Sequence, residues 1–174
     1  MKQRLVVLAL GWAIPAAAQF VPKSDWEEAQ EQRDWRESDV KPPAWPKREA
    51  LIEFFVSGAS SFRFFVDPAS LSVAADGVVR YTLVARSGSG VENVSYEGIR
   101  CAAGTYKVFA FGNDGQWRPI QSDWKLIEPR AVQRWHNVLR SDIFCPHRQP
   151  IRSTAEGVDA LRRGVHPLVK DGPR

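Results

Sequence analysis

The stretch after Asp76-Gly77 constrains the fold most, because its side chains alternate between apolar and mostly polar character. One set of alternate positions is apolar: Val79, Tyr81, Leu83 and Ala85. The other set carries two arginines and a threonine: Arg80, Thr82 and Arg86. A period of two residues is that of a β-strand. We therefore predict a half-buried strand with one face toward water, which is typical of antiparallel sheets.

Four further stretches have strand character: residues 51–56, 62–66, 93–101 and 106–111. Turn-forming residues separate these stretches: Asp67-Pro68, Ser87-Gly88-Ser89-Gly90 and Gly112-Asn113-Asp114-Gly115. We expect Asp67-Pro68 to end its strand, because proline lacks the backbone N–H that a ladder needs. The pattern predicts an antiparallel meander of about five strands between residues 51 and 121.

The apolar spacing changes to a helical period in the last third of the chain. Pro129 suits a first helical turn, and Val132, Trp135, Val138 and Leu139 form one apolar stripe after it. A second short helix is predicted at 154–163, where Ser153 and Glu156 form a capping box and Gly164 can end the helix. The predicted fold class is α+β, with the helices packed on the meander.

The first 18 residues have the pattern of a cleavable signal peptide. Lys2 and Arg4 precede an apolar run that is too short to span a bilayer, and Pro15 and an alanine triplet follow it. We expect Sec-type export to the periplasm or beyond, with cleavage near Ala18/Gln19. The alternative is an uncleaved membrane anchor, and no later stretch is apolar enough to cross a membrane.

In an oxidising compartment Cys101 and Cys145 are expected to form a structural disulfide. It would tie the end of a strand to the end of the first helix. The alternatives are a metal pair or a reactive thiol, but the chain has no C-x-x-C motif and no cysteine–histidine cluster at zinc spacing. We expect no metal and no cofactor.

The segment between the signal and the strands is charged and rich in proline. The expected organisation is a leader at 19–47, a single domain at 48–164 and a disordered tail at 165–174. Either the leader is mobile, or its tryptophans anchor it to a partner or to the domain's own surface: Trp26, Trp35 and Trp45.

The charge balance argues against nucleic acid as a partner. The chain has 24 basic and 20 acidic residues, and signal cleavage would remove two of the basic ones, which leaves a net charge of about +2. The basic residues form no stripe, because charges of both signs are interspersed.

Candidate binding residues lie on the polar alternation of the strands: Arg80, Arg86, Tyr96 and Arg100. Arginines beside an aromatic ring on a sheet face can bind a carboxylate or a sugar-linked acid. The alternative is a surface lattice of ion pairs. Glu97 falls on the opposite face, where we expect it to meet a nearby arginine inside the fold.

No residue is assigned a catalytic role. His136 is a weak candidate for a general base, with Asp142 or Glu128 as the orienting carboxylate, and the alternative is a helix-surface histidine. Neither an H-E-x-x-H nor a G-x-S-x-G motif occurs in the mature chain. Three tryptophans form either a carbohydrate platform or sheet–helix packing: Trp117, Trp124 and Trp135.

Residues 51–164 resemble the cryptic-neisserial-protein-like family of small exported proteobacterial proteins. An ordered run of segments carries the resemblance: Phe64-Phe65-Val66-Asp67, Leu71-Ser72-Val73, residues 76–84, residues 93–101, Ala110-Phe111-Gly112, Trp124, Arg130-Ala131-Val132 and Phe144-Cys145-Pro146. The resemblance implies no reaction and no catalytic residues. The strand–turn–strand layout and the two cysteines are also similar, at the level of fold, to surface-adhesin protein E domains, which implies adhesion to an extracellular ligand.

These observations favour a non-enzymatic envelope protein that binds a macromolecular partner. A carrier of a small anionic ligand on the arginine-bearing sheet face is the first alternative, and a cell-wall enzyme that uses His136 is the second. The oligomeric state stays open.

Overall fold

The computed structural model describes residues 24, 26–27, 30, 34–129 and 134–169. The chain divides into two units, residues 1–34 and residues 35–174. In the first unit, the Ser24 backbone N–H and hydroxyl both donate to Glu27. The signal peptide and its cleavage site lie outside the described residues. The fold and the site described below belong to the second unit.

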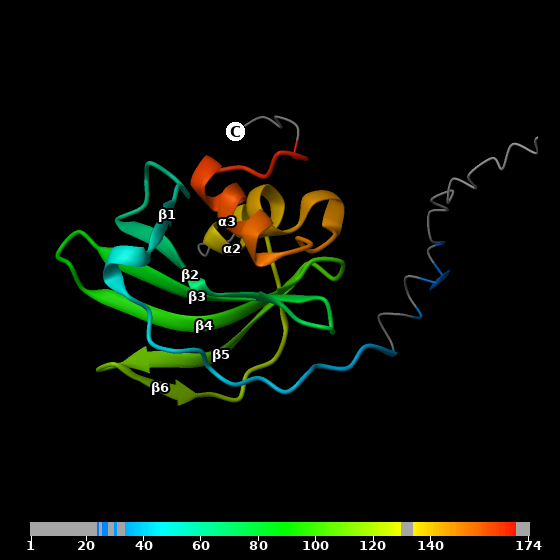
Figure 1. Ribbon diagram of the computed structural model, residues 1–174, viewed down its shortest axis with the longest axis horizontal. Coiled ribbons are helices and arrows are strands. Elements are labelled where there is room, and N and C mark those ends of the chain that lie inside the picture. The colour runs from blue at the N-terminus through cyan, green and yellow to red at the C-terminus, as the bar shows by residue number, and fades with distance from the viewer. Residues whose placement is uncertain (1–23, 25, 28–29, 31–33, 130–133, 170–174) are drawn as a thin grey trace, which may run out of the picture. The chain divides into compact units, whose positions relative to one another are not determined.

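The second unit is built on an antiparallel sheet in which sequence neighbours are spatial neighbours (Figure 1). The strands are β1 (Ile52–Phe54), β2 (Phe62–Val73), β3 (Val78–Ser87), β4 (Glu92–Arg100), β5 (Thr105–Asn113) and β6 (Gln116–Pro119). A short β7 (Lys125–Leu126) pairs with the start of β5. The predicted meander is confirmed, and β6 and β7 lengthen it because the chain returns along β5 after the turn at Gly115.

The predicted end of a strand at Asp67-Pro68 is wrong. The strand β2 continues to Val73 and its register against β3 shifts between Asp67 and Ser72. The ladder accommodates the missing N–H of Pro68 at this irregularity, where proline is tolerated in a strand. The Ser70 hydroxyl bridges the gap, because it donates to Asp67 O and accepts from the Thr82 N–H.

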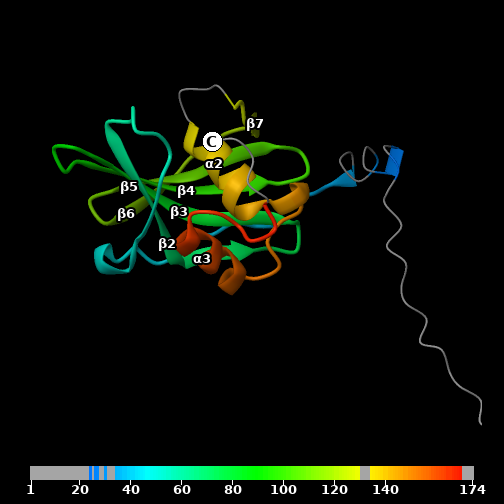
Figure 2. The same ribbon diagram turned by 90° about the horizontal axis from the view of Figure 1, so that it is seen from above.

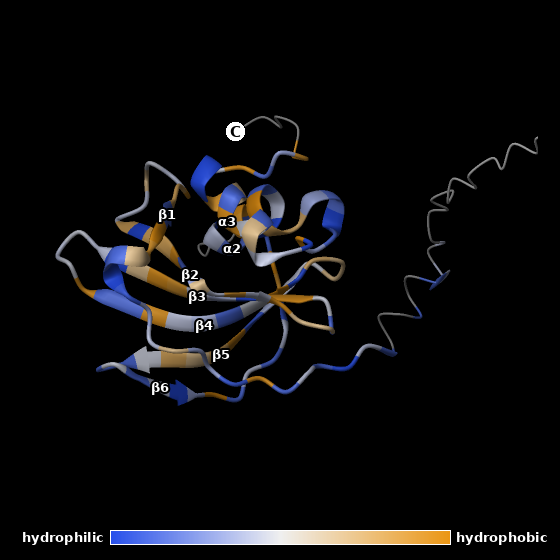
Figure 3. Ribbon diagram, in the orientation of Figure 1, coloured by the Kyte–Doolittle hydropathy of each residue, from blue (hydrophilic) through white to orange (hydrophobic). Residues whose placement is uncertain are grey.

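Two helices cover one face of the sheet, α2 (Arg134–Val138) and α3 (Thr154–Arg163) (Figures 1 and 2). The α2 helix runs on into a π-helical turn, Leu139–Phe144. The main core lies between the two layers, and Figure 3 shows apolar residues in both of them. Its fully buried members include Val79, Tyr81, Ile99, Leu139, Ile143, Phe144, Ile151 and Leu161. The predicted apolar set of β3 is therefore the inward-facing set.

Both predicted helices are present where the structure describes the chain. The start of the first one, at residues 130–133, lies outside the described residues. The second helix has the predicted caps: Ser153 Oγ accepts from the Glu156 N–H at 3.2 Å, and Gly164 adopts the left-handed conformation with a φ of 73°. Cys101, directly after β4, is disulfide-bonded to Cys145, directly after the π-helical turn. The predicted clasp between strand end and helix end is confirmed.

The other face of the sheet is covered as well. The expectation that this face of β3 is exposed to water is therefore wrong. Residues 35–46, hereafter the strap, run along it, on the side of the sheet opposite the helices (Figure 1). Trp35 Nε1 donates to Asp76 O at 2.8 Å, and Trp117 Nε1 donates to Pro43 O at 2.8 Å. Arg80 and Thr82 on this face are buried.

The strap decides between the two alternatives for the leader, as far as it is described. Trp35 lies edge-to-face on Trp124, and Trp45 lies against Trp117 with their ring centres 5.3 Å apart. These two tryptophans therefore contact the domain's own surface, while Trp26 is 69% exposed. The packed unit begins at Trp35, earlier than the expected start at residue 48.

Part of the chain after α3 is also packed, at His166. His166 belongs to the segment expected as a disordered tail, yet it is buried. Its Nε2 lies 2.9 Å from Glu156 Oε1, and its backbone N–H donates to Asp142 O. Polar composition alone did not reveal these contacts, because they join the end of the chain to α3 and the π-helical turn.

Candidate functional site

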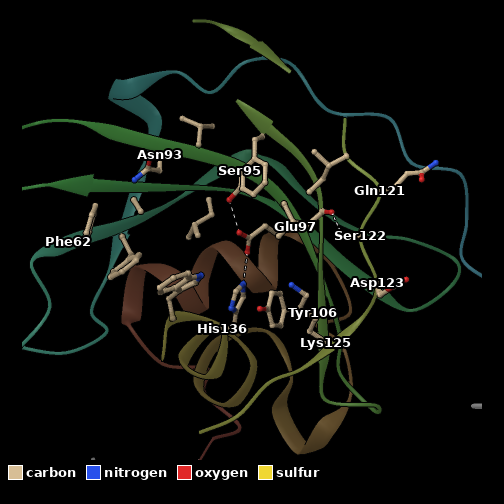
Figure 4. A pocket seen from close by; sticks show the side chains of 18 residues that line it. Phe62, Asn93, Ser95, Glu97, Tyr106, Gln121, Ser122, Asp123, Lys125 and His136 are labelled. Atoms are coloured by element: carbon tan, nitrogen blue, oxygen red, sulfur yellow. Dashed lines mark hydrogen bonds and ion pairs between the residues drawn. The ribbon is translucent and has the colours of Figure 1, made fainter. Parts of the chain in front are cut away.

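A pocket of about 510 Å³ lies between the sheet and α2 (Figure 4). Strands β2 to β5, the segment 120–125 and α2 all contribute to its lining. Most of the lining is apolar or aromatic: Phe62, Phe64, Leu83, Ala85, Val94, Tyr106, Val108, Phe111, Ile120 and Trp135. Such a volume and lining are in the range of sites that bind ligands.

Glu97 lies at the centre of the pocket's polar lining (Figure 4). Its side chain is only 4% exposed. Ser95 Oγ donates to Oε1 at 2.6 Å, Tyr81 OH donates to Oε2 at 3.0 Å, and His136 Nε2 lies 2.9 Å from Oε2. The strand period places Ser95 and Glu97 on the helix side of β4, and pairing with β3 sets Tyr81 opposite Glu97.

His136 is fixed by contacts on several sides. The ring of Tyr106 stacks on it with the ring centres 3.7 Å apart, and Trp135 packs beside it. Its Nδ1 is buried and has no hydrogen-bond partner in the described part of the chain. The imidazole therefore joins α2 to β4 and β5 and forms part of the pocket wall.

The carboxylate also affects the two tyrosines near it. Burial raises the pKa of the Tyr81 hydroxyl well above its usual range, and the charge of Glu97 and their hydrogen bond add to this effect. Burial likewise raises the pKa of the Tyr106 hydroxyl, again with a contribution from Glu97. Both hydroxyls therefore keep their protons at neutral pH.

The structure corrects two predicted partnerships. The carboxylate beside His136 is Glu97, and neither Asp142 nor Glu128 takes that place. Among the described residues Glu97 meets no arginine, because Arg80 and Arg100 lie on the opposite face of the sheet. One sequence signal could have identified the site: Glu97 occupies an inward position of β4, two residues before the fully buried Ile99.

The four candidate binding residues share the strap side of the sheet, as their alternation predicts. Arg80 is bonded to Asp76 by both terminal nitrogens, and Arg86 pairs with Glu92. The Arg100 guanidinium lies 3.7 Å from the ring centre of Trp35. Tyr96 packs in a cluster with Phe109, Ala110 and strap residue Val40. Tyr96 and Arg100 therefore pack with the strap, while Arg80 and Arg86 are held in ion pairs within the sheet. None of the four lines the pocket described above.

Trp117, Trp124 and Trp135 do not form one platform. Trp117 and Trp124 lie on the strap side, where they pack with Tyr96, Phe109 and the strap. Trp135 stacks on Phe64 on the helix side, with ring centres 5.1 Å apart. Their positions fit packing on two opposite faces of the sheet.

A second cavity of about 600 Å³ lies between the strap and β5. Residues 120–123 line both cavities and form a wall between them. In the described part of the chain, no helix is long and apolar enough to cross a membrane. The same residues hold no cluster of three or more His, Cys, Asp or Glu side chains that could bind a metal ion.

Comparison with known proteins places the chain among relatives without assigning it a reaction. It is 33% identical over 78 residues to cryptic neisserial protein 1 of Neisseria gonorrhoeae, a match that covers 37% of this chain and 38% of that protein. The match thus spans well under half of that relative's length. No solved structure matches the chain. The CNP1-like family matches residues 30–162, which include the strap, the whole sheet, α2 and all of α3 but its last residue. The chain therefore belongs to the CNP1-like family.

Proposed function

We propose that the protein is an exported, non-enzymatic binding domain that accepts part of a partner polypeptide in the pocket between the sheet and α2. The main observation behind this proposal is that two aromatic side chains at the pocket's mouth are exposed to solvent. Phe62 and Phe111 line the pocket and remain 37% and 51% exposed. Exposed aromatic side chains around a concavity are typical of protein interaction sites.

The hydrogen bonding of His136 supports a role without catalysis. A general base must present a ring nitrogen to the substrate. Here Nε2 is bonded to Glu97, and Nδ1 is buried away from solvent. Ser95 donates to the carboxylate, so it is not arranged as a nucleophile activated by the histidine.

Site-specific photo-cross-linking in cells tests the proposed interface. The photoreactive residue benzoylphenylalanine replaces Phe111 at the pocket mouth, and in a matched control it replaces Leu126, which is 71% exposed and does not line the pocket. We expect a discrete protein adduct from position 111 and none from position 126. Equal labelling at both positions, or none at 111, would refute the proposed interface.

The proposal of export relies on the N-terminal pattern and is supported by membership of the CNP1-like family. Cell fractionation and intact-mass measurement test it. We expect the protein in the periplasm or the medium, with a mass that corresponds to loss of residues 1–18. Recovery of the full-length chain from the cytoplasm would exclude export.

A further inference from the structure

We infer that the pocket selects a cationic group, the ammonium or guanidinium of a lysine or arginine side chain in the partner polypeptide. This inference depends on the proposed function, because it specifies what the same pocket accepts. Three features of the pocket carry it: an incompletely bonded carboxylate, the charge state of the neighbouring histidine, and aromatic walls.

The first feature is the hydrogen-bond capacity of Glu97. A carboxylate offers about four lone-pair sites. Oε2 accepts from Tyr81 and from His136, while Oε1 accepts from Ser95 alone. One acceptor site on Oε1 therefore has no donor in the described part of the chain. A donor from a ligand would complete the set.

The second feature is the neutral form of His136. An imidazolium would need a partner for Nδ1–H, and Nδ1 is buried without one among the described residues. A buried unpaired N–H on a charged ring costs more than an unpaired lone pair on a neutral ring. The geometry thus favours the Nε2–H tautomer, which bonds to Glu97 without neutralising its charge.

The other charged groups of the lining do not neutralise the carboxylate either. They are Asp123 and Lys125, which are both exposed and of opposite sign. No ion pair joins Glu97 to a lysine or arginine in the described residues, and the arginines of β3 and β4 lie on the other face. The pocket therefore carries one net negative charge, located in its least exposed part.

The third feature is the set of aromatic walls: Phe62, Phe64, Tyr106, Phe111 and Trp135. The faces of aromatic rings attract cations, and their apolar surface packs against the alkyl stem of a lysine or arginine. A carboxylate ligand would be repelled by Glu97. An apolar ligand would bury Glu97 further and supply no donor to it, which is costly.

Three small probes with the same alkyl chain test the inference on the full chain: hexylamine, hexanol and hexanoate. Amide and indole signals of Ser95, Glu97 and Trp135 in ¹⁵N–¹H correlation spectra report on the pocket. We expect hexylamine to bind roughly tenfold more tightly than hexanol, since it adds a charged hydrogen bond and a cation–π contact. Hexanoate should not bind.

A matched pair of variants locates the effect. Glu97→Gln should reduce hexylamine affinity to the level of hexanol, while Glu92→Gln, on the same strand and paired with Arg86, should leave it unchanged. If Glu97→Gln fails to fold, the ratio of the hexylamine and hexanol affinities of the unaltered chain still tests the inference. Equal binding of hexanol and hexylamine overturns the cation inference and leaves the pocket proposal standing. The inference is also overturned if hexanoate binds, or if none of the three probes binds. The proposed function is tested separately, by the cross-link from position 111.

Discussion

The Nε2 atom of His136 lies 2.9 Å from Oε2 of Glu97, although the two residues are 39 positions apart in the chain. Both side chains are almost fully buried. The contact connects a helix that covers the sheet to the central strand beneath it. It therefore contributes to the stability of the fold and to the shape of the pocket at the same time.

Replacement of His136 by alanine should lower the free energy of unfolding by about 3 kcal/mol, because it removes a donor from a buried carboxylate. Urea unfolding followed by tryptophan fluorescence measures this change. The control is His147→Asn, because His147 is exposed and its φ of 53° suits asparagine. A double-mutant cycle with Glu97→Gln should give a coupling above about 1 kcal/mol, and additive effects would contradict a direct interaction.

Trp35→Ala should destabilise the domain by about 2 kcal/mol, since Trp35 packs on Trp124 and on the Arg100 guanidinium and donates to Asp76 O. The matched control is Trp26→Ala, because Trp26 is 69% exposed. Thermal unfolding of both variants measures the difference. If the two variants unfold at the same temperature, the strap does not stabilise the sheet.

Asp76 makes stability depend on acid pH. Burial alone would raise its pKa, but hydrogen bonds from Arg80, Ser38 N–H and Val78 N–H outweigh burial and hold the pKa below its usual range. Near these pKa values the folded state thus binds fewer protons than the unfolded state. The stabilisation by ionised Asp76 is therefore fully present above the unfolded pKa of about 3.9, and it is lost as the pH falls through the folded pKa.

The variant Asp76→Asn tests this dependence. It should lower the free energy of unfolding by about 2 kcal/mol at pH 7, because Arg80 loses its charged partner. Its stability should also fall less steeply than that of the unaltered protein between pH 5 and pH 2. Unfolding curves at several pH values measure both effects, and parallel pH profiles would show that Asp76 does not contribute.

Loss of the Cys101–Cys145 disulfide should cost roughly 4 kcal/mol, the value of the chain-entropy relation for a loop of this length. Denaturant unfolding with and without a reductant measures it. The double variant Cys101→Ala/Cys145→Ala should match the reduced protein and should not respond to the reductant. A reductant that leaves the unaltered protein's midpoint in place would contradict a structural role for the bond.

Gly157→Ala should destabilise α3 against the sheet even though alanine favours helices. A Cβ atom there would lie 2.5 Å from Ile151 Cδ1 and 2.7 Å from Leu71 Cδ2, so the core must shift to admit it. We expect a loss of about 2 kcal/mol in unfolding free energy. The control Gly88→Ala adds a Cβ that meets nothing within 4 Å and should change stability little. A stabilised Gly157→Ala protein would indicate that α3 packs more loosely than described.

Local sequence patterns were sufficient to predict much of the fold. The alternation at Val79, Tyr81 and Leu83 identified the inward face of β3, and Ser153 and Gly164 identified both ends of α3. These features depend on backbone periods and on contacts within a few residues. The pairing of Cys101 with Cys145 was also predictable, because the chain contains only these two cysteines.

The candidate site was predicted in part. His136 and Glu97 both stood out from the sequence, but each was assigned the wrong partner. The arginines of β3 were expected to face water because local alternation does not report what covers a face. The strap brings Trp35 and Pro43 onto that face from a distant part of the chain, and Arg80 is buried there in an ion pair with Asp76.

The sequence by itself therefore determined the strands, the helix caps, the inward-facing set of β3 and the cysteine pair, because each of these depends on short-range periodicity or on a simple count. The tertiary structure alone decided that Glu97 meets His136, that the strap covers the arginine-bearing face, and that a pocket with Glu97 among its lining residues remains between sheet and helix. Each of these depends on how segments tens of residues apart pack against one another, and local residue preferences do not contain that information.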